Sequence, residues 1–249
     1  MLAFRIVNHS IRQIICDVPV MLRLLWAPVG LHVLAVYILF NAGERQLLLR
    51  EFGDPFPPET ASREVLLLLL FFLLVMWLAV SFHRFILREE EPSVVPALSH
   101  ETRSYLARSI LIVVMAILLV IPVAISGAII AGIAETSLGP HPVVSFLVIT
   151  APILLVEPVI LRWSAGLPGI ALGEENAFKK GEASLAGHYW LLLWVTVIVS
   201  VIGYIVHLLV VLPGLPVLYY IASNWFSTLL NLSVLTTLWG YFVEGRELH

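Results

Sequence analysis

The segment from Val65 to Phe82, VLLLLLFFLLVMWLAVSF, contains no charged residue. An α-helix needs about 20 apolar residues to cross the hydrocarbon core of a bilayer, and an uncharged run of this length is typical of a transmembrane helix. In a water-soluble protein, every face of such a helix would have to be buried by other parts of the chain. The segment therefore predicts a fold that is embedded in a membrane.

The composition of the whole chain agrees with this prediction. Of its 249 residues, 60% are hydrophobic and only 12% are charged, and the mean hydropathy is +0.98. A soluble domain of this size could not hide so much apolar surface inside itself. Because no polar stretch is long enough to form a separate soluble domain, residues 1–249 are expected to form a single integral membrane domain.

Six segments have the length and apolarity expected of a membrane span. They are residues 20–41, 64–87, 106–134, 142–162, 188–212 and 215–242. The last two are separated only by the turn Pro213-Gly214-Leu215-Pro216, whose prolines and glycine break a continuous helix, so they are expected to form a tight hairpin. The predicted fold class is an all-α, polytopic transmembrane bundle of about six spans.

Short amphipathic helices are expected at the membrane surface beside these spans. Residues 4–18 have the pattern of a helix that lies on the inner surface of the bilayer. Its residues expected to face lipid are Phe4, Ile11, Ile14 and Ile15. Residues 44–52 and 174–186 have similar patterns, so each is also expected to form a short interfacial helix.

Basic residues are unequally distributed between the two ends of such a bundle. With six spans, only Arg45, Arg50 and Arg63 lie on the side opposite the termini. The side that carries the termini holds Arg5, Arg12, Arg23, Arg84, Arg88, Arg103, Arg108, Arg162, Lys179, Lys180 and Arg246. Because cytoplasmic flanks carry the excess of Lys and Arg, both termini are expected in the cytoplasm, as in a multi-pass protein of the bacterial inner membrane.

Two polar stripes are predicted to meet between the last two spans. Spacings of three and four residues place Thr196, Ser200, Tyr204 and His207 on one helix face, and Tyr220, Asn224, Ser227 and Asn231 on one face of the next helix. In an antiparallel hairpin these faces come into register. Side-chain hydrogen bonds in lipid contribute roughly 0.6–2 kcal/mol each, so this polar seam either only holds the hairpin together or forms a polar path or ligand cleft.

Glu157 is the carboxylate that lies well inside a predicted span. A charge at this depth is costly unless it is paired or hydrated, which makes Glu157 a candidate functional residue. Arg162 is on the same helix but about 140° away around its axis. His83, Arg84 and Arg108 lie at the same predicted end of the bundle, so Glu157 is expected to point inward and pair with one of them. An ion pair between Glu157 and one of these residues is interpreted as structural. The alternative is that the Glu157 carboxylate binds a proton or a substrate.

Two other patterns concern the membrane interface and the packing of helices. The seven tryptophans mostly lie near the ends of predicted spans, as residues of an aromatic belt do. Ala124, Ala128 and Gly132 recur at steps of four residues, a spacing of small side chains that lets another helix approach closely.

Signatures of catalysis and of cofactor binding are missing from the sequence. There is no G-x-S-x-G, no phosphate-binding loop and no H-E-x-x-H motif, and the eight histidines lack metal-ligand spacing. One cysteine, Cys16, is too few for a cysteine-based zinc or iron–sulfur site. A net charge of −3 does not favour nucleic-acid binding. We therefore expect no cofactor, no metal and no enzymatic activity.

The glycine-rich run Arg162-Trp-Ser-Ala-Gly-Leu-Pro-Gly-Ile-Ala-Leu-Gly173 lacks the lysine of a phosphate-binding loop and is interpreted as a re-entrant or surface loop. Followed by Ala177-Phe178 and Gly187-His-Tyr-Trp190, it resembles a pattern in uncharacterised proteobacterial polytopic membrane proteins. These proteins are similar to the membrane domain attached to some glycerophosphodiester phosphodiesterases, and the resemblance covers about residues 79–190. One departure is Leu191, where the pattern usually has a basic residue. Because the catalytic barrel is absent, the resemblance implies a membrane module without hydrolase activity.

Three functions remain open from the sequence. The first is a non-enzymatic module, either a lipid-contacting scaffold or an accessory subunit whose partners are lipids and other membrane proteins. The second is a small transporter or channel that uses Glu157 and the polar seam, which a hydrated path would favour. The third is a membrane-embedded enzyme acting on lipids, which a headgroup-sized basic pocket around Arg84, Arg108 and Arg162 would favour.

Overall fold

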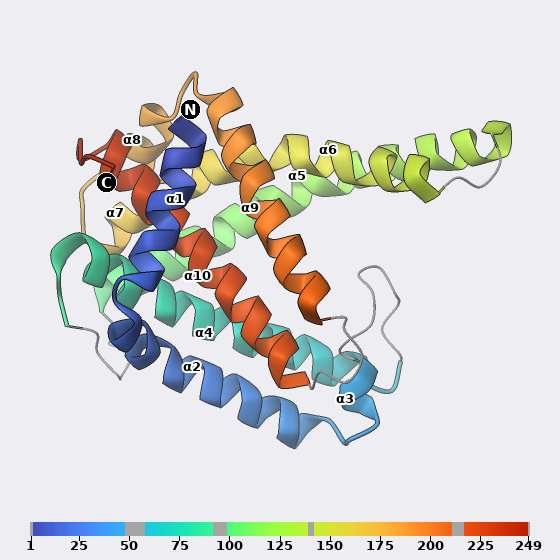
Figure 1. Cartoon of the computed structure of the whole chain (residues 1–249), viewed down its shortest axis with the longest axis horizontal. Coiled ribbons are helices and arrows are strands. Elements are labelled where there is room, and N and C mark those ends of the chain that lie inside the picture. The colour runs from blue at the N-terminus through green and yellow to red at the C-terminus, as the bar shows by residue number, and fades with distance from the viewer. Residues whose placement is uncertain (1, 48–57, 92–98, 139–141, 211–216, 249) are drawn as a thin grey trace.

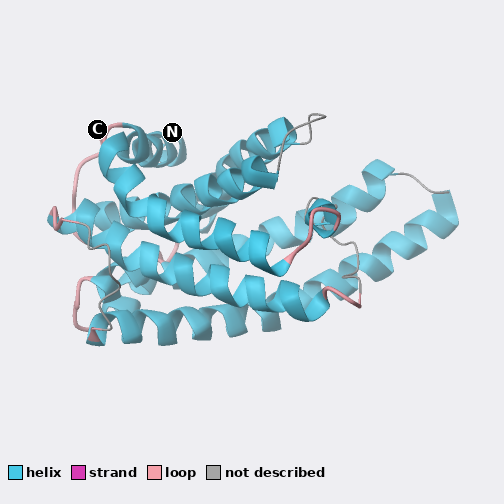
Figure 2. Ribbon diagram, turned by 90° about the horizontal axis from the view of Figure 1, so that it is seen from below, coloured by secondary structure: helices cyan, strands magenta, loops and turns pink. Residues whose placement is uncertain are grey.

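A computed structural model describes residues 2–47, 58–91, 99–138, 142–210 and 217–248, and the chain there is helical with no strand (Figures 1 and 2). The long helices are α2 (Val18–Leu39), α4 (Ala61–Arg88), α5 (His100–Leu138), α6 (Pro142–Ser164), α9 (Tyr189–Val210) and α10 (Val217–Phe242). The short helices are α1 (Leu2–Ile15), α3 (Glu44–Leu47), α7 (Leu167–Ala171) and α8 (Ala177–Ser184). Each predicted span coincides with a long helix. The turn at residues 213–216 and most of the segment 44–52 lie outside the described residues.

Five of the described helical segments are long and apolar enough to cross a bilayer. They are Val18–Leu39, Ala61–Arg88, His100–Ile133, Leu154–Ala171 and Tyr189–Val206. The chain is therefore a multi-pass membrane protein. The sixth predicted span corresponds to α10, which is 26 residues long but carries several Ser, Thr and Asn residues that lower its hydropathy.

The position of α10 explains why its composition differs from that of the other long helices. It packs against α1, α2, α4, α7 and α9, and it lies in the middle of the bundle (Figure 1). Every residue from Leu232 to Gly240 is buried. Because neighbouring helices enclose this half of α10, its polar side chains meet protein rather than lipid.

Helix α5 is at the opposite extreme of exposure. Only 11% of its most apolar 18-residue stretch is buried, and the side chains of Leu118 and Ile133 are 69% and 62% exposed. The second half of α5 and the first half of α6 form a hairpin that extends beyond the other helices (Figure 1). The predicted small-residue face is wrong in its register, because Ala128 is exposed and Gly132 has no neighbour within 4 Å, whereas Gly127 and Ala131 are buried.

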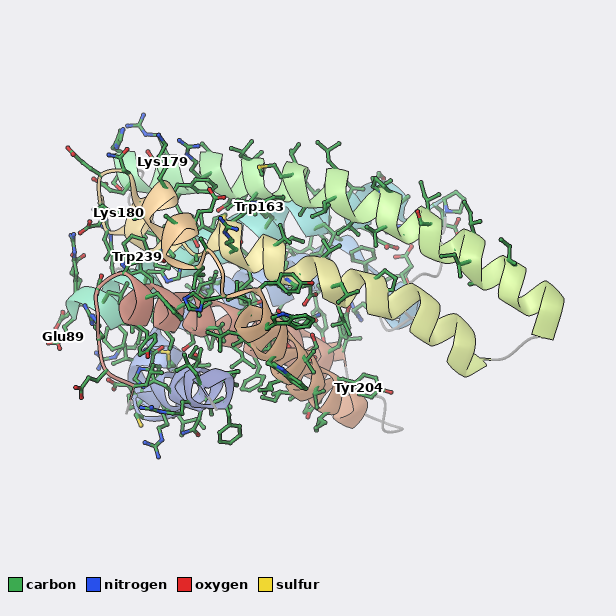
Figure 3. The ribbon with its side chains drawn as sticks, turned by 90° about the horizontal axis from the view of Figure 1, so that it is seen from above. Glu89, Trp163, Lys179, Lys180, Tyr204 and Trp239 are labelled. Carbon is green, nitrogen blue, oxygen red and sulfur yellow. The ribbon has the colours of Figure 1, made fainter. Side chains whose placement is uncertain are left out.

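Both chain termini lie at one end of the bundle, here called the terminal end (Figure 1). Arg5 Nη2 donates a hydrogen bond of 3.1 Å to the backbone oxygen of Leu248, which joins the two ends of the described chain. Lys179, Lys180 and Glu89 lie at the same end (Figure 3). This arrangement places the groups of basic residues flanking α4, α5, α6 and α9 together, as the sequence predicts.

Helix α1 forms as the predicted amphipathic helix, but other helices cover part of its apolar face. It packs across α9 and α10, with Ile6 and Val7 almost fully buried. Of the residues expected to face lipid, Phe4 and Ile15 are exposed, whereas Ile11 and Ile14 pack against the hydrophobic core. The periodicity identifies the apolar face correctly, but neighbouring helices cover part of it in place of lipid.

The interpretation of the glycine-rich run as a loop is wrong, because its central residues form the buried helix α7. A Cβ atom on Gly169 would overlap the ring of Trp239, and one on Gly181 of α8 would lie 2.5 Å from the backbone nitrogen of Gly166. Only glycine therefore permits α7, α8 and α10 to approach so closely.

The aromatic-belt prediction is wrong for Trp239 and Trp225, which are only 1% and 2% exposed.

Candidate functional site

A cavity of about 420 Å³ lies between α6, α9 and α10. Two features that were predicted independently meet here: Glu157 of α6 lines the cavity together with polar-seam residues of α9 and α10. The seam residues that line it are Thr196, Ser200, Ser227 and Asn231. We refer to this space as the Glu157 cavity.

Helix positions account for the opening. Helix α9 packs against both α6 and α10, and the cavity lies along the groove that the three helices share. Gly203 of α9 faces α10 here, because a Cβ atom on it would come within 3.9 Å of Ser227 Oγ. A larger residue at position 203 would therefore narrow the cavity beside the hydroxyl group of Ser227.

The polar atoms of the Glu157 cavity are largely unused by the protein. Within the described part of the chain, the Glu157 carboxylate makes no hydrogen bond or ion pair, and neither do the hydroxyl groups of Thr196, Ser200 and Ser227. Asn231 Nδ2 donates to the backbone oxygen of Ser227 at 2.9 Å, which leaves the Asn231 side-chain oxygen as an acceptor. The cavity thus presents one carboxylate and several neutral oxygen atoms. Such a set accepts hydrogen bonds from a cationic donor.

The prediction that Glu157 pairs with His83, Arg84 or Arg108 is wrong. Arg84 donates from Nε to the backbone oxygen of Ala171 at 2.9 Å and forms an ion pair with Glu101 at 3.5 Å. The guanidinium of Arg108 lies over the ring of Phe178, 5.4 Å from its centroid. Both guanidinium groups therefore contact parts of the bundle other than Glu157.

Arg162, the remaining cationic candidate, also has a structural role. Its Nε donates to the backbone oxygen of Glu182 at 3.1 Å, and its Nη2 lies 3.5 Å from the Glu182 carboxylate. The contact fastens the end of α6 to α8. A basic pocket formed jointly by Arg84, Arg108 and Arg162 is therefore not present among the described residues, because each guanidinium contacts a different neighbour.

The polar seam differs in part from its predicted form. The pairs Thr196 with Asn231 and Ser200 with Ser227 converge on the same cavity, but no direct hydrogen bond joins their side chains. Tyr204 is 61% exposed and points away from the bundle (Figure 3). The side chain of His207 lies outside the described residues, so its predicted pairing with Tyr220 is not tested.

A buried polar network was missed by the sequence reasoning. His83 is fully buried, with Nδ1 2.8 Å from Thr236 Oγ1 and Nε2 3.2 Å from Tyr105 Oη. Thr236 donates its own proton to the backbone oxygen of Leu232, so it accepts from His83 Nδ1–H, and Tyr105 donates to Nε2. This arrangement satisfies a neutral His83 and makes it a structural residue that joins α4, α5 and α10.

The same region of α10 also binds α1. Ser233 Oγ donates to Gln13 Oε1 at 2.7 Å and lies 2.8 Å from the backbone oxygen of Ser10. Ser10 Oγ and Thr237 Oγ1 are 3.0 Å apart. Ser233 and Thr237 are four residues apart on α10, and Ser10 and Gln13 are three apart on α1. That spacing was visible in the sequence, but nothing indicated that these two stripes would meet.

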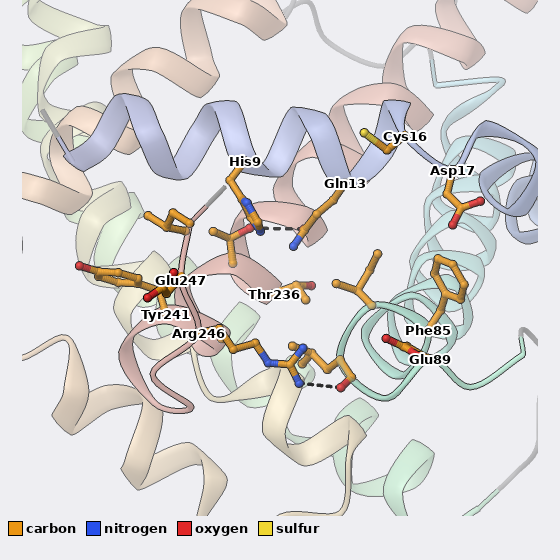
Figure 4. A pocket seen from close by; sticks show the side chains of 15 residues that line it. His9, Gln13, Cys16, Asp17, Phe85, Glu89, Thr236, Tyr241, Arg246 and Glu247 are labelled. Atoms are coloured by element: carbon orange, nitrogen blue, oxygen red, sulfur yellow. Dashed lines mark hydrogen bonds between the residues drawn. The ribbon is translucent and has the colours of Figure 1, made fainter.

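A larger cavity, about 950 Å³, lies beside this network at the terminal end (Figure 4). It is bounded by α1, the ends of α4 and α10 and the C-terminal tail. Arg246 Nη2 donates to the backbone oxygen of Leu87 at 2.6 Å, which holds the tail against α4. Its charged lining contains both signs, including Asp17, Glu89 and Arg246, so it does not indicate one class of ligand. Among the described residues, no three His, Cys, Asp or Glu side chains form a group suited to a metal ion.

Comparisons of the chain with models of protein families, with curated proteins and with solved structures find no match.

Proposed function

We propose that this chain is a six-span, non-enzymatic membrane module of the bacterial inner membrane. In this proposal it acts by contact, as a lipid-contacting scaffold or as an accessory subunit of a membrane complex. Six spans make α10 the central span and place both termini on one side. The eleven basic residues on that side support a cytoplasmic position for the termini.

The observation that carries the proposal is that the side chains chemically suited to act on lipid headgroups serve structural roles. His83 is enclosed between Thr236 and Tyr105, while Arg84 and Arg162 are bound to Glu101 and Glu182. An enzyme that acts on lipid headgroups needs such groups positioned toward a substrate. Their use in packing favours a module that works through its surfaces.

The exposed apolar face of α5 is the surface best suited to contact. Its outward residues are large and aliphatic along several helical turns, including Ile110, Val114, Leu118, Ile121 and Ile125. Lipid tails or an apolar face of another membrane protein would cover them. The resemblance of residues 79–190 to membrane modules that accompany other domains supports the same proposal.

Photo-cross-linking in native membranes tests this function. A photoreactive residue at exposed Leu118 is expected to label lipid if the chain is a scaffold, or one defined protein if it is an accessory subunit. Ile112, on the same helix but 5% exposed, is the matched control and should label neither. Turnover of a lipid substrate by the purified chain alone would contradict the proposal.

A second candidate function, a small transporter or channel, is favoured by the Glu157 cavity. An unpaired carboxylate inside a span is a common feature of ion and substrate pathways. Purified chain in liposomes would then carry a cation current that Glu157→Gln abolishes and Glu174→Gln, at the surface, preserves. Liposomes that stay tight at every cation gradient would exclude this candidate.

A further inference from the structure

We propose that the Glu157 cavity binds a primary ammonium group carried by an apolar molecule. This inference goes beyond the contact function and does not depend on it, because the cavity and the exposed face of α5 are different parts of the molecule. It concerns binding and requires no transport.

Charge is the first argument for this ligand. Glu157 belongs to an apolar helical segment, and no basic residue is among those that line the cavity. A carboxylate in a membrane span is strongly favoured to acquire a cationic partner. The protein itself supplies none within the described residues, so a bound cation is the group that would complete the site.

Hydrogen bonding narrows the class of cation. A primary ammonium carries three N–H donors and no acceptor. The cavity offers the matching set of acceptors, because the Glu157 carboxylate lies with the unpaired hydroxyl groups of Thr196, Ser200 and Ser227 around one space. A quaternary ammonium has no N–H group and could not use these oxygen atoms in the same way.

Cavity size and lining identify the rest of the ligand. A volume of about 420 Å³ lies within the range of small-molecule sites, roughly 300–1,000 Å³, and is more than ten times the share of one water, about 30 Å³. A bare metal ion would leave most of this space empty. Apart from Ser164 and Asn231, the remaining walls are apolar, so they suit an apolar body. These residues include Leu161, Val195, Val199, Leu230 and Val234.

The depth of the site allows the primary ammonium group to come from either of two kinds of molecule. Glu157 lies seven residues before the end of α6 at Ser164, or about 10 Å along the helix at about 1.5 Å per residue. The ethanolamine headgroup of a phospholipid that enters between the helices can reach this depth. A free amphiphilic amine can reach it as well.

Native mass spectrometry of the purified full-length chain separates these sources. Phosphatidylethanolamine is compared with phosphatidylcholine of the same acyl chains, and dodecylamine with dodecyltrimethylammonium. We expect the primary ammonium member of at least one pair to bind with 1:1 stoichiometry and about tenfold more tightly than its quaternary partner. Preference within the lipid pair alone identifies a lipid headgroup as the source, and preference within the amine pair alone identifies a small amphiphile.

Two variants connect this preference to the site. Glu157→Gln keeps the size of the side chain but removes its charge, so we expect the preference to be lost, with binding weakened about tenfold or more. Glu174→Gln, an exposed carboxylate paired with Lys180, is the matched control and should bind as the unmodified chain does.

Serine variants keep the test decisive if Glu157→Gln fails to fold. The double variant Ser200→Ala, Ser227→Ala retains the carboxylate and should weaken binding several-fold, because two acceptors are lost. Equal binding of primary and quaternary ligands, or equal binding by the unmodified chain and the cavity variants, would overturn the proposal. Neither result would alter the assignment of the α5 face as a contact surface.

Discussion

Replacing Gly181 with alanine is expected to force α8 away from the end of α6. A Cβ atom at this position would lie 2.5 Å from the nitrogen and 2.6 Å from the Cα of Gly166, and 2.8 Å from the carbonyl carbon of Ala165. All three blocking atoms belong to the backbone, so no side chain can rotate out of the way. Contacts near 3.4 Å would be restored only if the two segments moved apart by a substantial fraction of an ångström.

Two opposing effects set the magnitude. Alanine is favoured over glycine inside a helix by about 1 kcal/mol, which would stabilise α8. Overpacking costs about 1–3 kcal/mol, and the immobile backbone places this substitution at the upper end of that range. The net expectation is a loss of about 2 kcal/mol in the free energy of unfolding.

Equilibrium unfolding of the purified chain in detergent measures this loss. Gly132→Ala is the matched control, since Gly132 is also helical and has no neighbouring atom within 4 Å of a Cβ. Gly132→Ala should be neutral or slightly stabilising. If Gly181→Ala were as stable as the unmodified chain, the close approach of α8 and α6 would not limit stability, and our reasoning about the glycine-rich run would fail.

Three further substitutions test other parts of the structure. Glu157→Gln should leave the free energy of unfolding unchanged or raise it, because the carboxylate has no partner in the described residues; a marked loss in the same unfolding assay would reveal a structural partner. His83→Ala should cost about 3 kcal/mol in that assay, since it removes a fully buried ring and leaves two hydroxyl groups unpaired. At the opposite end of the bundle, the hydrogen bond from Arg63, followed by one from the backbone N–H of Asn41, holds the pKa of Glu44 below its ordinary value of 4.5. This depressed pKa stabilises the folded chain above pH 4.5 and the contribution is lost as pH falls through the lower folded value, so Glu44→Gln should flatten that part of a stability–pH profile.

The contacts of the glycine-rich run are concentrated at the terminal end of the bundle. Gly166, Gly169 and Gly181 stand where α7, α8 and Trp239 meet, and Arg162 fastens α6 to α8. Each of these residues serves packing at the terminal end. The three glycines and Arg162 therefore have a structural role that requires no ligand.

The sequence by itself determined the membrane-embedded, all-helical fold and the positions of the six long helices. Predicted and observed limits differ by at most six residues, from 188–212 against Tyr189–Val210 to 106–134 against His100–Leu138. This succeeds because the length and apolarity of a span are local properties of the chain. The shared faces of Thr196 with Ser200 and of Ser227 with Asn231 were likewise predictable from helical periodicity.

Only the tertiary structure decided which helix each face meets. It placed Glu157 toward α9 and α10 rather than toward Arg84, seated α1 on α10, and enclosed Trp239 against Gly169. In water, the apolar stripe of a helix marks the side that is buried. In a bilayer, lipid tails and packed side chains are equally apolar, so the pattern of hydrophobic residues does not distinguish a lipid-facing side from a helix-facing one.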